Sequence, residues 1–422
     1  MPLKKRLTDF LNTISFSSGD LNVKIDDIGQ KHLDMFHRLR TSEPNTIFDS
    51  KQLHDKLPLF WDESITDGSG NATSTHSTTD ASTTMHVESG DTIIRQTKTH
   101  WGYQPGKSQF CIYTANLLSS GSATGVKGRV GSFTATDGVF WEYDAGAISA
   151  VVRKGSSDTK VASTAFNFDT LDGSGPSGVT LDPTKTQILW IAYEWLGVGS
   201  VAYGIFIDAN PIIAHITHHA NIATSVYMAT PNLPVRYEIS STSATAEMQH
   251  ICSTVISEGG SQENGPIVGD SLSTTVVEAG VANTIYAIMG LRLKSTHLDA
   301  TVRIEDFNLL DVQGKRSEYF IAVNPTIAGA FAWTDVANSA CQTGRSAGGT
   351  QSAETVTADS WDTRFNIGYL STADKKASRA GGDVPSALAL GSTIGGTPDE
   401  FVLCIKAYEN NPDVLAAINW RE

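Results

Sequence analysis

Two carboxylates stand two residues apart in the stretch Trp141-Glu142-Tyr143-Asp144. In an extended strand, residues i and i+2 point to the same face, so both acids would lie on one side of a sheet. Glycoside hydrolysis requires a pair of acids at a defined separation, one protonated and one ionised. The same pattern also fits an edge strand with solvated acids. We prefer the edge strand and assign no catalytic residue.

A second group that could do chemistry is the only histidine cluster, His215, His218 and His219 with Asn221 nearby. Two imidazoles presented together could bind zinc, but zinc sites combine three or four ligands and usually include cysteine or an acid. Neither type stands beside these histidines in the sequence. We therefore predict a polar rim of hydrogen-bonded histidines and assign no metal ligand.

The glycine-rich loop DTLDGSGPSG offers oxygen ligands from Asp169, Asp172 and Ser174, as calcium loops do. The full D-x-D-x-D-G order is missing, which favours a structural turn. The sequence contains no G-x-S-x-G, P-loop or dinucleotide fingerprint. We assign no cofactor-binding residue and no cofactor.

Five aromatic residues could stack on sugar rings if they were exposed. These are Trp101, Tyr103, Trp141, Tyr143 and Trp195. They form the basis of an alternative function, glycan recognition, in which Glu142 and Asp144 would be the acids to test.

The elements that must position these residues are organised around residues 187–208, QILWIAYEWLGVGSVAYGIFID. An apolar run, a glycine-containing turn and a segment with two-residue alternation predict two antiparallel strands. The first strand is apolar on both faces, which predicts a central strand in a sheet that is covered on each side. Gly204 inside the second strand indicates a close backbone approach or a bulge.

Turn signals and short apolar segments repeat along the remaining chain and predict an all-β fold with two antiparallel β-sandwich domains, jelly-roll or concanavalin-A-like. The polar linker SEGGSQENGP separates them, so we place one sandwich at 51–260 and the second at 266–422. The Ser/Thr-rich stretch 66–89 is interpreted as a surface strand with its loops.

Residues 1–50 differ from the rest and are predicted to be an N-terminal assembly arm, extended or helical. Leu7, Phe10, Leu11 and Ile14 recur at helical spacing, and residues 32–40, HLDMFHRLR, fit a helix or a strand equally well. Such a segment has no core of its own. It must dock either on its own body or on a neighbouring subunit.

Composition excludes several classes of function. The formal net charge of −14 argues against nucleic-acid binding, which depends on Lys and Arg neutralising phosphates. No segment approaches the about 20 apolar residues of a membrane span, and no signal pattern opens the chain. Four well-separated cysteines, Cys111, Cys252, Cys341 and Cys404, are expected to be buried thiols, although the sequence leaves one long-range disulfide open.

Several stretches together resemble a family of virion structural proteins of tailed bacteriophages, common in aquatic phages and described as capsid- or tail-associated. The likeness covers most of residues 32–260 and returns weakly at the C-terminus. It is carried by FHRLRTSEPNTIFDSKQLHDKLPLFWDES, STHSTTDAST, YQPGKSQ, RVGSFTATDGVFWEYD, LDGSGPSGVTLDPTKTQILWIAYEWLGVGSVAYGIFID, HHAN, YMATPNLPVRYEI, ICSTVISEGG and the final NWRE.

The region EWLGVGSVAYGIFID is also similar to strand patterns of concanavalin-A-like sandwiches. Laminarinase-like members of that group carry E-x-D-x-x-E on one strand. Glu142 and Asp144 match its first two acids, while Ala147 stands at the third. Ala202 stands where a G-x-V-R-F-G pattern would have arginine, so no ligand role of that cation carries over.

The resemblance implies a non-enzymatic virion component assembled in many copies, as a capsid decoration or as a tail, collar or fibre part. Its partners would be other virion proteins and further copies of itself, as a trimer or dimer, without nucleic acid or membrane. It would be assembled in the bacterial cytoplasm and located in the virion. The alternative is a host-glycan-binding or glycan-degrading β-sandwich module. A capsid shell subunit is disfavoured because the sequence offers no long helix.

Overall fold

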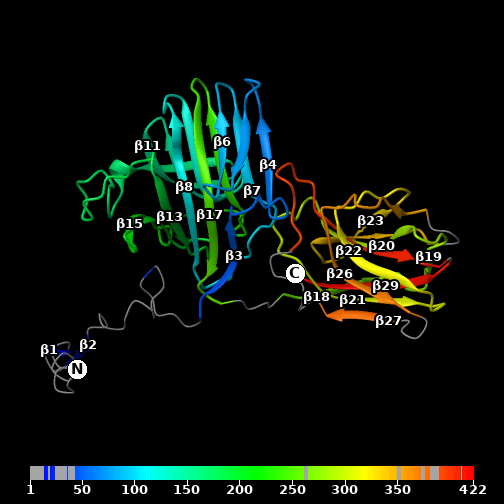
Figure 1. Ribbon diagram of the computed structural model, residues 1–422. Helices are drawn as coiled ribbons and strands as arrows, with labels where there is room; N and C mark the ends of the chain where they lie inside the picture. Colours follow the sequence, from blue (N-terminus) through cyan, green and yellow to red (C-terminus); the bar gives the residue numbers. More distant parts are fainter. Residues whose placement is uncertain are drawn as a thin grey trace, which may run out of the picture.

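The computed structural model describes residues 14–17, 20–23, 36, 43–260, 265–348, 353–371, 376–380, 389–409 and 411–422. Within these ranges the chain is built almost entirely of antiparallel strands, with one short 3-10 turn, η3 (Ser163–Ala165). They form two β-sandwiches that lie side by side (Figure 1). The predicted all-β class with two antiparallel sandwiches is confirmed. No helix in the described residues has the length and apolarity needed to cross a membrane.

The first sandwich contains a seven-stranded sheet in the order β12-β11-β10-β9-β16-β7-β4. These strands are β4 (Trp61–Thr66), β7 (Thr92–Thr97), β9 (Val126–Phe133), β10 (Gly138–Asp144), β11 (Ala147–Lys154), β12 (Ser157–Ala162) and β16 (Val235–Ser241). Its inward side chains pack against the second sheet, because alternate residues of each strand point to the same face.

The second sheet of this sandwich has eight strands in the order β15-β14-β13-β8-β17-β6-β5, with β3 pairing the free part of β17. Its strands are β3 (Asn45–Lys51), β5 (Thr73–Ser77), β6 (Ser82–Val87), β8 (Gln109–Gly121), β13 (Thr186–Tyr193), β14 (Val201–Ile207), β15 (Asn210–Thr217) and β17 (Ala246–Ser257). The Ser/Thr-rich stretch, predicted as a surface strand with its loops, forms a hairpin in which β5 is the edge strand and β6 lies inside the sheet and is largely buried.

The predicted central hairpin is confirmed as β13 and β14, joined through residues 194–200. β13 lies inside the sheet between β14 and β8. Both expectations for Gly204 also hold. A bulge separates Tyr203 from Gly204, and the indole of Trp190 lies across Gly204 so closely that a Cβ there would be 2.0 Å from Trp190 Cζ2.

The second sandwich packs a five-stranded sheet, β18-β29-β21-β27 with β19, against a seven-stranded sheet, β23-β24-β20-β28-β22-β26 with β25. The smaller sheet holds β18 (Ile267–Ser271), β19 (Val277–Glu278), β21 (Arg303–Asp311), β27 (Lys376–Ala380) and β29 (Asp413–Arg421). The larger holds β20 (Ile285–Leu293), β22 (Ser317–Val323), β23 (Ala332–Asp335), β24 (Cys341–Arg345), β25 (Thr355–Val356), β26 (Thr363–Leu370) and β28 (Glu400–Ala407).

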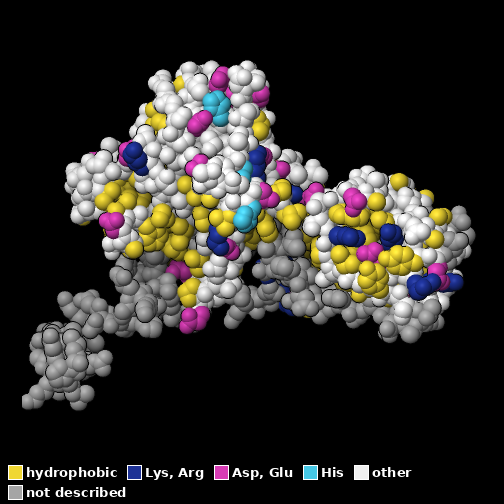
Figure 2. Space-filling model, viewed as in Figure 1, with side chains coloured by type: hydrophobic (Ala, Val, Ile, Leu, Met, Phe, Trp, Pro, Cys, Tyr) yellow, Lys and Arg dark blue, Asp and Glu magenta, His cyan; other side chains and the backbone are white. Residues whose placement is uncertain are grey.

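Each sandwich has its own hydrophobic core between its sheets. Fully buried aromatic side chains such as Trp141 and Tyr203 fill the first core, and Trp420 closes one end of the second. Polar side chains cover much of the outer surface, with hydrophobic groups gathered in patches on both bodies (Figure 2). All four cysteines are free thiols, and only Cys252 is partly exposed.

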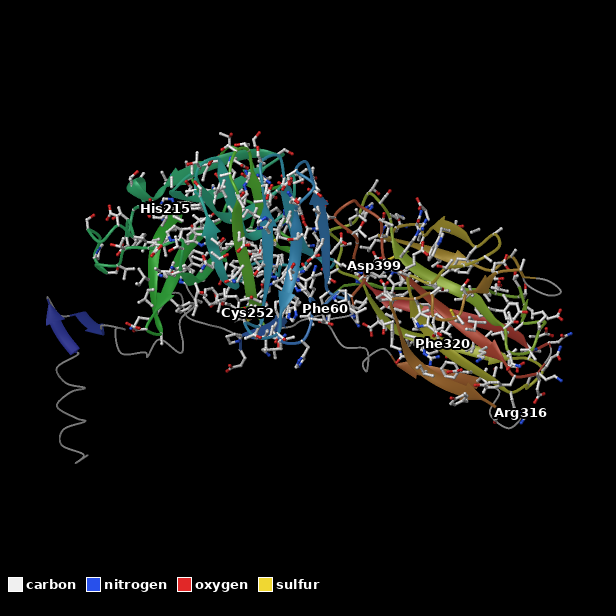
Figure 3. All side chains as sticks on the ribbon, turned by 45° about the horizontal axis from the view of Figure 1, so that its top comes forward. Phe60, His215, Cys252, Arg316, Phe320 and Asp399 are labelled. Carbon is white, nitrogen blue, oxygen red and sulfur yellow. The ribbon has the colours of Figure 1, made fainter. Side chains whose placement is uncertain are left out.

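The segment 391–399 of the second sandwich bonds directly to the first (Figure 3 shows Asp399 on the side facing it). Ser392 N donates to Lys98 O at 3.0 Å, and Ile394 N donates to Asp62 Oδ2 at 2.7 Å. Lys98 Nζ lies 3.8 Å from Asp399 Oδ1. These bonds attach the two bodies to each other apart from the linker.

At the N-terminal end, β1 (Ile14–Ser17) pairs with β2 (Asp20–Val23). Of the helix predicted from Leu7, Phe10, Leu11 and Ile14, the first three residues lie outside the described residues, and Ile14 lies in strand β1, so the helical prediction is wrong there. Most of 32–40 also lies outside the described residues. Phe36 is described and packs against the first sandwich. Because β3 begins at Asn45, the first sandwich includes residues before the boundary placed at 51.

Candidate functional site

The acid pair of β10 does not have the environment that we predicted. β10 lies inside its sheet between β9 and β11, so the expectation of an edge strand is wrong. Glu142 is 1 % exposed and accepts from Arg129 Nε at 2.7 Å and from Lys160 Nζ at 2.5 Å. Asp144 shares its face, as the spacing requires, and lies 3.1 Å from Lys127 Nζ at the end of the strand.

Glu142 belongs to a row of alternating charges across the outer face of this sheet. Arg129 also donates from Nη1 to Glu238 at 2.5 Å, and Arg236 Nε donates to the same carboxylate at 3.0 Å. Burial raises the pKa of Glu238, but the guanidinium groups of Arg236 and Arg129 outweigh it and hold that pKa below its usual value. The row therefore consists of ionised groups engaged with each other.

Two of the three histidines form the predicted polar rim of hydrogen-bonded side chains, whereas His215 is buried and its Nδ1 has no hydrogen-bond partner among the described residues. His219 stacks on Tyr227 at 4.2 Å between ring centroids and has Nδ1 2.7 Å from Gly199 O, while His218 Nδ1 lies 3.0 Å from Ser200 Oγ. His215 instead stacks on Phe166. Burial lowers the pKa of both His215 and His219. Among the described residues, no three His, Cys, Asp or Glu side chains come together as metal ligands would.

The loop at Asp169 is the structural turn that the sequence favoured. Asp169 accepts backbone N–H groups of Leu171 and Ser177 at 2.9 and 2.8 Å. Asp172 accepts the backbone N–H of Ser174 at 2.9 Å and the Thr170 hydroxyl at 2.7 Å. These carboxylate oxygens stabilise the loop itself.

The five aromatic candidates are separated by the fold. Trp141 and Tyr143 are buried in the first core, on the opposite face of β10 from its acids, so they lack the exposure that stacking on an external sugar would require. Trp195 is partly exposed and donates from Nε1 to Met228 O at 3.1 Å. Trp101 and Tyr103 are also buried, but they line a cavity between the two sandwiches.

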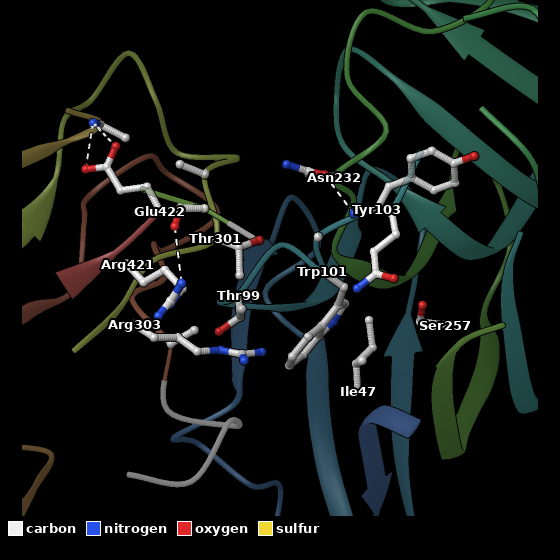
Figure 4. A pocket seen from close by; sticks show the side chains of 16 residues that line it. Ile47, Thr99, Trp101, Tyr103, Asn232, Ser257, Thr301, Arg303, Arg421 and Glu422 are labelled. Carbon is white, nitrogen blue, oxygen red and sulfur yellow. Dashed lines mark hydrogen bonds between the residues drawn. The ribbon is translucent and has the colours of Figure 1, made fainter. Parts of the chain in front are cut away.

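This cavity has a volume of about 420 Å³ and receives side chains from both bodies (Figure 4). The first sandwich contributes Ile47, Thr99, Trp101, Tyr103, Gln104, Asn232 and Ser257. The second contributes Thr301, Arg303, Ala340, Ala389, Arg421 and Glu422. Sequence reasoning missed the site because its two walls lie some 200 residues apart in the chain.

Asn232 connects the two walls. Its Oδ1 accepts from Tyr103 N at 2.9 Å, and its Nδ2 donates to Asp299 O at 3.1 Å. Thr301 Oγ1 adds a second bridge, to His100 O at 3.3 Å. Asn232 comes from the turn 231–234, PNLP, in which two prolines restrict the backbone, and Trp101 and Tyr103 are the lining residues that the sequence had singled out.

The charged groups in the wall are held largely by the second sandwich. Arg421 pairs with Glu305 and donates to Gly265 O at 3.2 Å. Glu422 accepts from Trp420 Nε1 at 2.8 Å and from Ala340 N at 3.0 Å. Beside the cavity, burial lowers the pKa of His100 to about 4, so this ring is neutral at pH 7.

Trp101 stands out among the lining residues. Its indole stacks on Phe48 at 4.4 Å between ring centroids, and the side chain is 2 % exposed. Yet its Nε1–H has no hydrogen-bond partner in the described part of the chain. A buried donor without a partner costs about 1–3 kcal/mol, so native structures rarely leave one.

No family model matches the chain, and no curated protein matches its sequence. Solved structures with a similar fold include an endo-1,3-β-glucanase from Streptomyces sioyaensis, at TM-score 0.36 and 10 % identity over 51 % of this chain and 97 % of that one. A β-glucanase from Bacillus licheniformis aligns at TM-score 0.31 and 10 % identity over 51 % and 98 %. The CBM2 module of an evolved Dit from Lactobacillus casei BL23 phage J-1 aligns at 0.32 and 8 % over 52 % and 99 %.

These similarities concern the fold alone, a β-sandwich of the concanavalin-A-like or jelly-roll kind that the resemblance implied. They also correct one prediction. We expected a protein that is not an enzyme, and this expectation is contradicted, because glucanases and other glycoside hydrolases are among the structures that share the fold. Membership in a phage virion family stays a prediction.

Proposed function

We propose that the protein binds a glycan, holding a short run of sugar units in the cavity between its two sandwiches. The cavity of about 420 Å³ falls in the about 300–1,000 Å³ range of small-ligand sites, which often form between domains. Such a location allows both bodies to contribute contacts to one ligand.

The chemistry of the lining favours a polyhydroxylated ligand. A sugar has an apolar face of C–H groups and an edge of hydroxyls that both donate and accept. Trp101 and Tyr103 supply aromatic surface, while Gln104, Thr99 and Thr301 supply neutral polar groups. Arg421 and Glu422 are held by other protein groups, while Arg303 adds a positive charge to the wall beside these neutral groups.

The single observation that carries this proposal is the indole N–H of Trp101. It is buried, lines the cavity and lacks a protein acceptor in the described residues. Because Nε1 is itself buried, the indole would have to turn toward the cavity for a ligand hydroxyl to accept this hydrogen bond, and the new bond would then remove the desolvation penalty. The free energy of that bond would then count toward binding.

The test replaces Trp101 by phenylalanine, which keeps an aromatic ring against Phe48 but removes the donor. Loss of one neutral hydrogen bond, about 0.5–1.5 kcal/mol, should raise Kd about 2- to 13-fold. An array of neutral and acidic oligosaccharides of one to six sugar units would identify ligands, and titration calorimetry would measure them. Trp195→Phe is the matched control, since Trp195 donates to Met228 O outside the cavity.

Two results would contradict the proposal. One is an array on which the folded protein binds no oligosaccharide. The other is a ligand whose Kd changes equally in Trp101→Phe and Trp195→Phe, because binding would then not depend on the cavity.

The virion role remains a proposal that rests on the resemblance over residues 32–260. Assembly in several copies on a phage particle would place the glycan site where the particle contacts the surface of its host. Imaging of intact particles with this protein labelled tests it, and particles that lack the label would refute it.

A further inference from the structure

The outer face of the eight-stranded sheet carries a cluster of buried hydrophobic side chains, unlike a surface that is exposed to water. Trp190, Ala192 and Ala202 point away from the core between the sheets, yet all three are 0 % exposed. Partly buried hydrophobic residues from β8, β14 and β15 surround them, namely Phe110, Ile112, Phe206, Ile213 and Ile216. Hydrophobic side chains gather on the same side of this body in Figure 2.

Within the described residues, Phe36 is the contributor to this cluster from outside the sheet. The short stretch of chain between Phe36 and β3 is long enough to connect them across this face. β3 begins at Asn45 opposite Ser257, and Ser257 lies opposite Gln109, the neighbour of Phe110. The nine residues from Phe36 to Asn45 can span about 30 Å, far enough to lie across the sheet.

The sequence around Phe36 fits the face that it contacts. Leu33, Met35 and Leu39 surround Phe36, and charged or imidazole groups fill the positions between them. Such a segment can bury one apolar side and leave its polar groups in water.

We propose that Phe36 covers the Trp190 cluster on the outer face of the eight-stranded sheet as a contact within one chain, and not as a contact with a second copy. This is the first of the two options, the chain's own body or a neighbouring subunit, that the sequence left open. The occupant is this chain, because its own Phe36 is seated on the cluster and its own β3 starts beside it.

The first test uses the full chain with Phe36→p-benzoylphenylalanine, a photo-reactive side chain. Irradiation should give a product that migrates as a monomer on a denaturing gel. Its cross-linked peptides should come from β8, β13, β14 or β15. A covalent dimer would mean that the segment docks on a second copy. A dimer, links elsewhere, or no intrachain link would each overturn the proposal.

The second test asks whether the segment protects the face. Phe36→Asp should raise the fluorescence of a hydrophobic dye such as ANS several-fold, because the Trp190 cluster loses its cover. Leu53→Asp is the control, since Leu53 is 49 % exposed and lies outside this face. Equal dye binding by the two variants would refute the docking, provided that circular dichroism shows both to be folded.

Discussion

Replacement of Gly204 by alanine tests the packing of the central hairpin. Gly204 lies opposite Trp190 in the β13–β14 ladder. An added Cβ would be 2.0 Å from Trp190 Cζ2 and 2.3 Å from Ile212 O. Carbon atoms pack at about 3.5–4.0 Å, so the indole would have to move by about 1.5 Å.

Trp190 has little freedom to move. It is fully buried, its Nε1 donates to Ile205 O at 3.1 Å, and Phe110 packs beside it at 5.7 Å between ring centroids. Overpacking costs about 1–3 kcal/mol, and a buried N–H that loses its acceptor costs about 1–3 kcal/mol more. We therefore expect Gly204→Ala to lower the free energy of unfolding of the first sandwich by about 2–6 kcal/mol.

Urea unfolding followed by tryptophan fluorescence measures this change, with the transition of each sandwich analysed separately because two bodies need not unfold together. Gly395→Ala is the control, because its Cβ would meet only Thr393 Oγ1 at 3.7 Å. In a Trp190→Phe background the cost of Gly204→Ala should fall by about 1 kcal/mol or more, since contacting residues couple. A cost below about 0.5 kcal/mol, the range of neutral surface changes, would refute the reasoning.

Three further predictions concern charge and thiol chemistry. Glu142→Gln should destabilise the first sandwich by about 3 kcal/mol, because it breaks a buried ion pair, whereas Asp144→Asn should cost less than about 1 kcal/mol in the same denaturant assay. Glu238 has a folded-state pKa below its unfolded value, so its stabilisation is present above the unfolded pKa and is lost as pH falls through the folded one. Arg236→Gln should therefore move acid unfolding, followed by circular dichroism, to higher pH, and an unchanged midpoint would contradict this. Cys252 should be the first of the four thiols to react with a maleimide in the native protein, as read by mass spectrometry, because only it is partly exposed.

The features that the sequence predicted well are those with a local cause. The hairpin of β13 and β14 follows from apolar runs separated by a turn. The role of Gly204 follows from one missing Cβ inside a strand. In the same way, the spacing of Glu142 and Asp144 placed both acids on one face of β10, as observed.

The environment of those acids could not be predicted because it is assembled from distant strands. Glu142 is covered by Arg129 on β9 and by Lys160 on β12. Arg129 also donates to Glu238, which is 109 residues further along the chain. Only the strand order of the sheet brings these side chains together. The burial of Trp141 could not be predicted for the same reason, since nothing near it in sequence shows which face is covered.

The cavity was hidden for a further reason, namely that it belongs to neither sandwich alone. Trp101 and Arg303 meet there only because the two bodies are fixed to each other. Asn232 lies in a turn with two prolines, but its bridging hydrogen bond to Asp299 O depends on the second body.

Because both sandwiches line this cavity, ligand binding and the association of the two sandwiches are coupled in one equilibrium. A molecule that touches both walls resists their separation, and at a hundred times its Kd it adds about 2.7 kcal/mol against any opening that releases it. A pulling force or a protease that acts between the two sandwiches would therefore meet an interface whose stability depends on the concentration of the ligand in solution. The interface between the two sandwiches would therefore respond to the ligand concentration as well as hold the two sandwiches together.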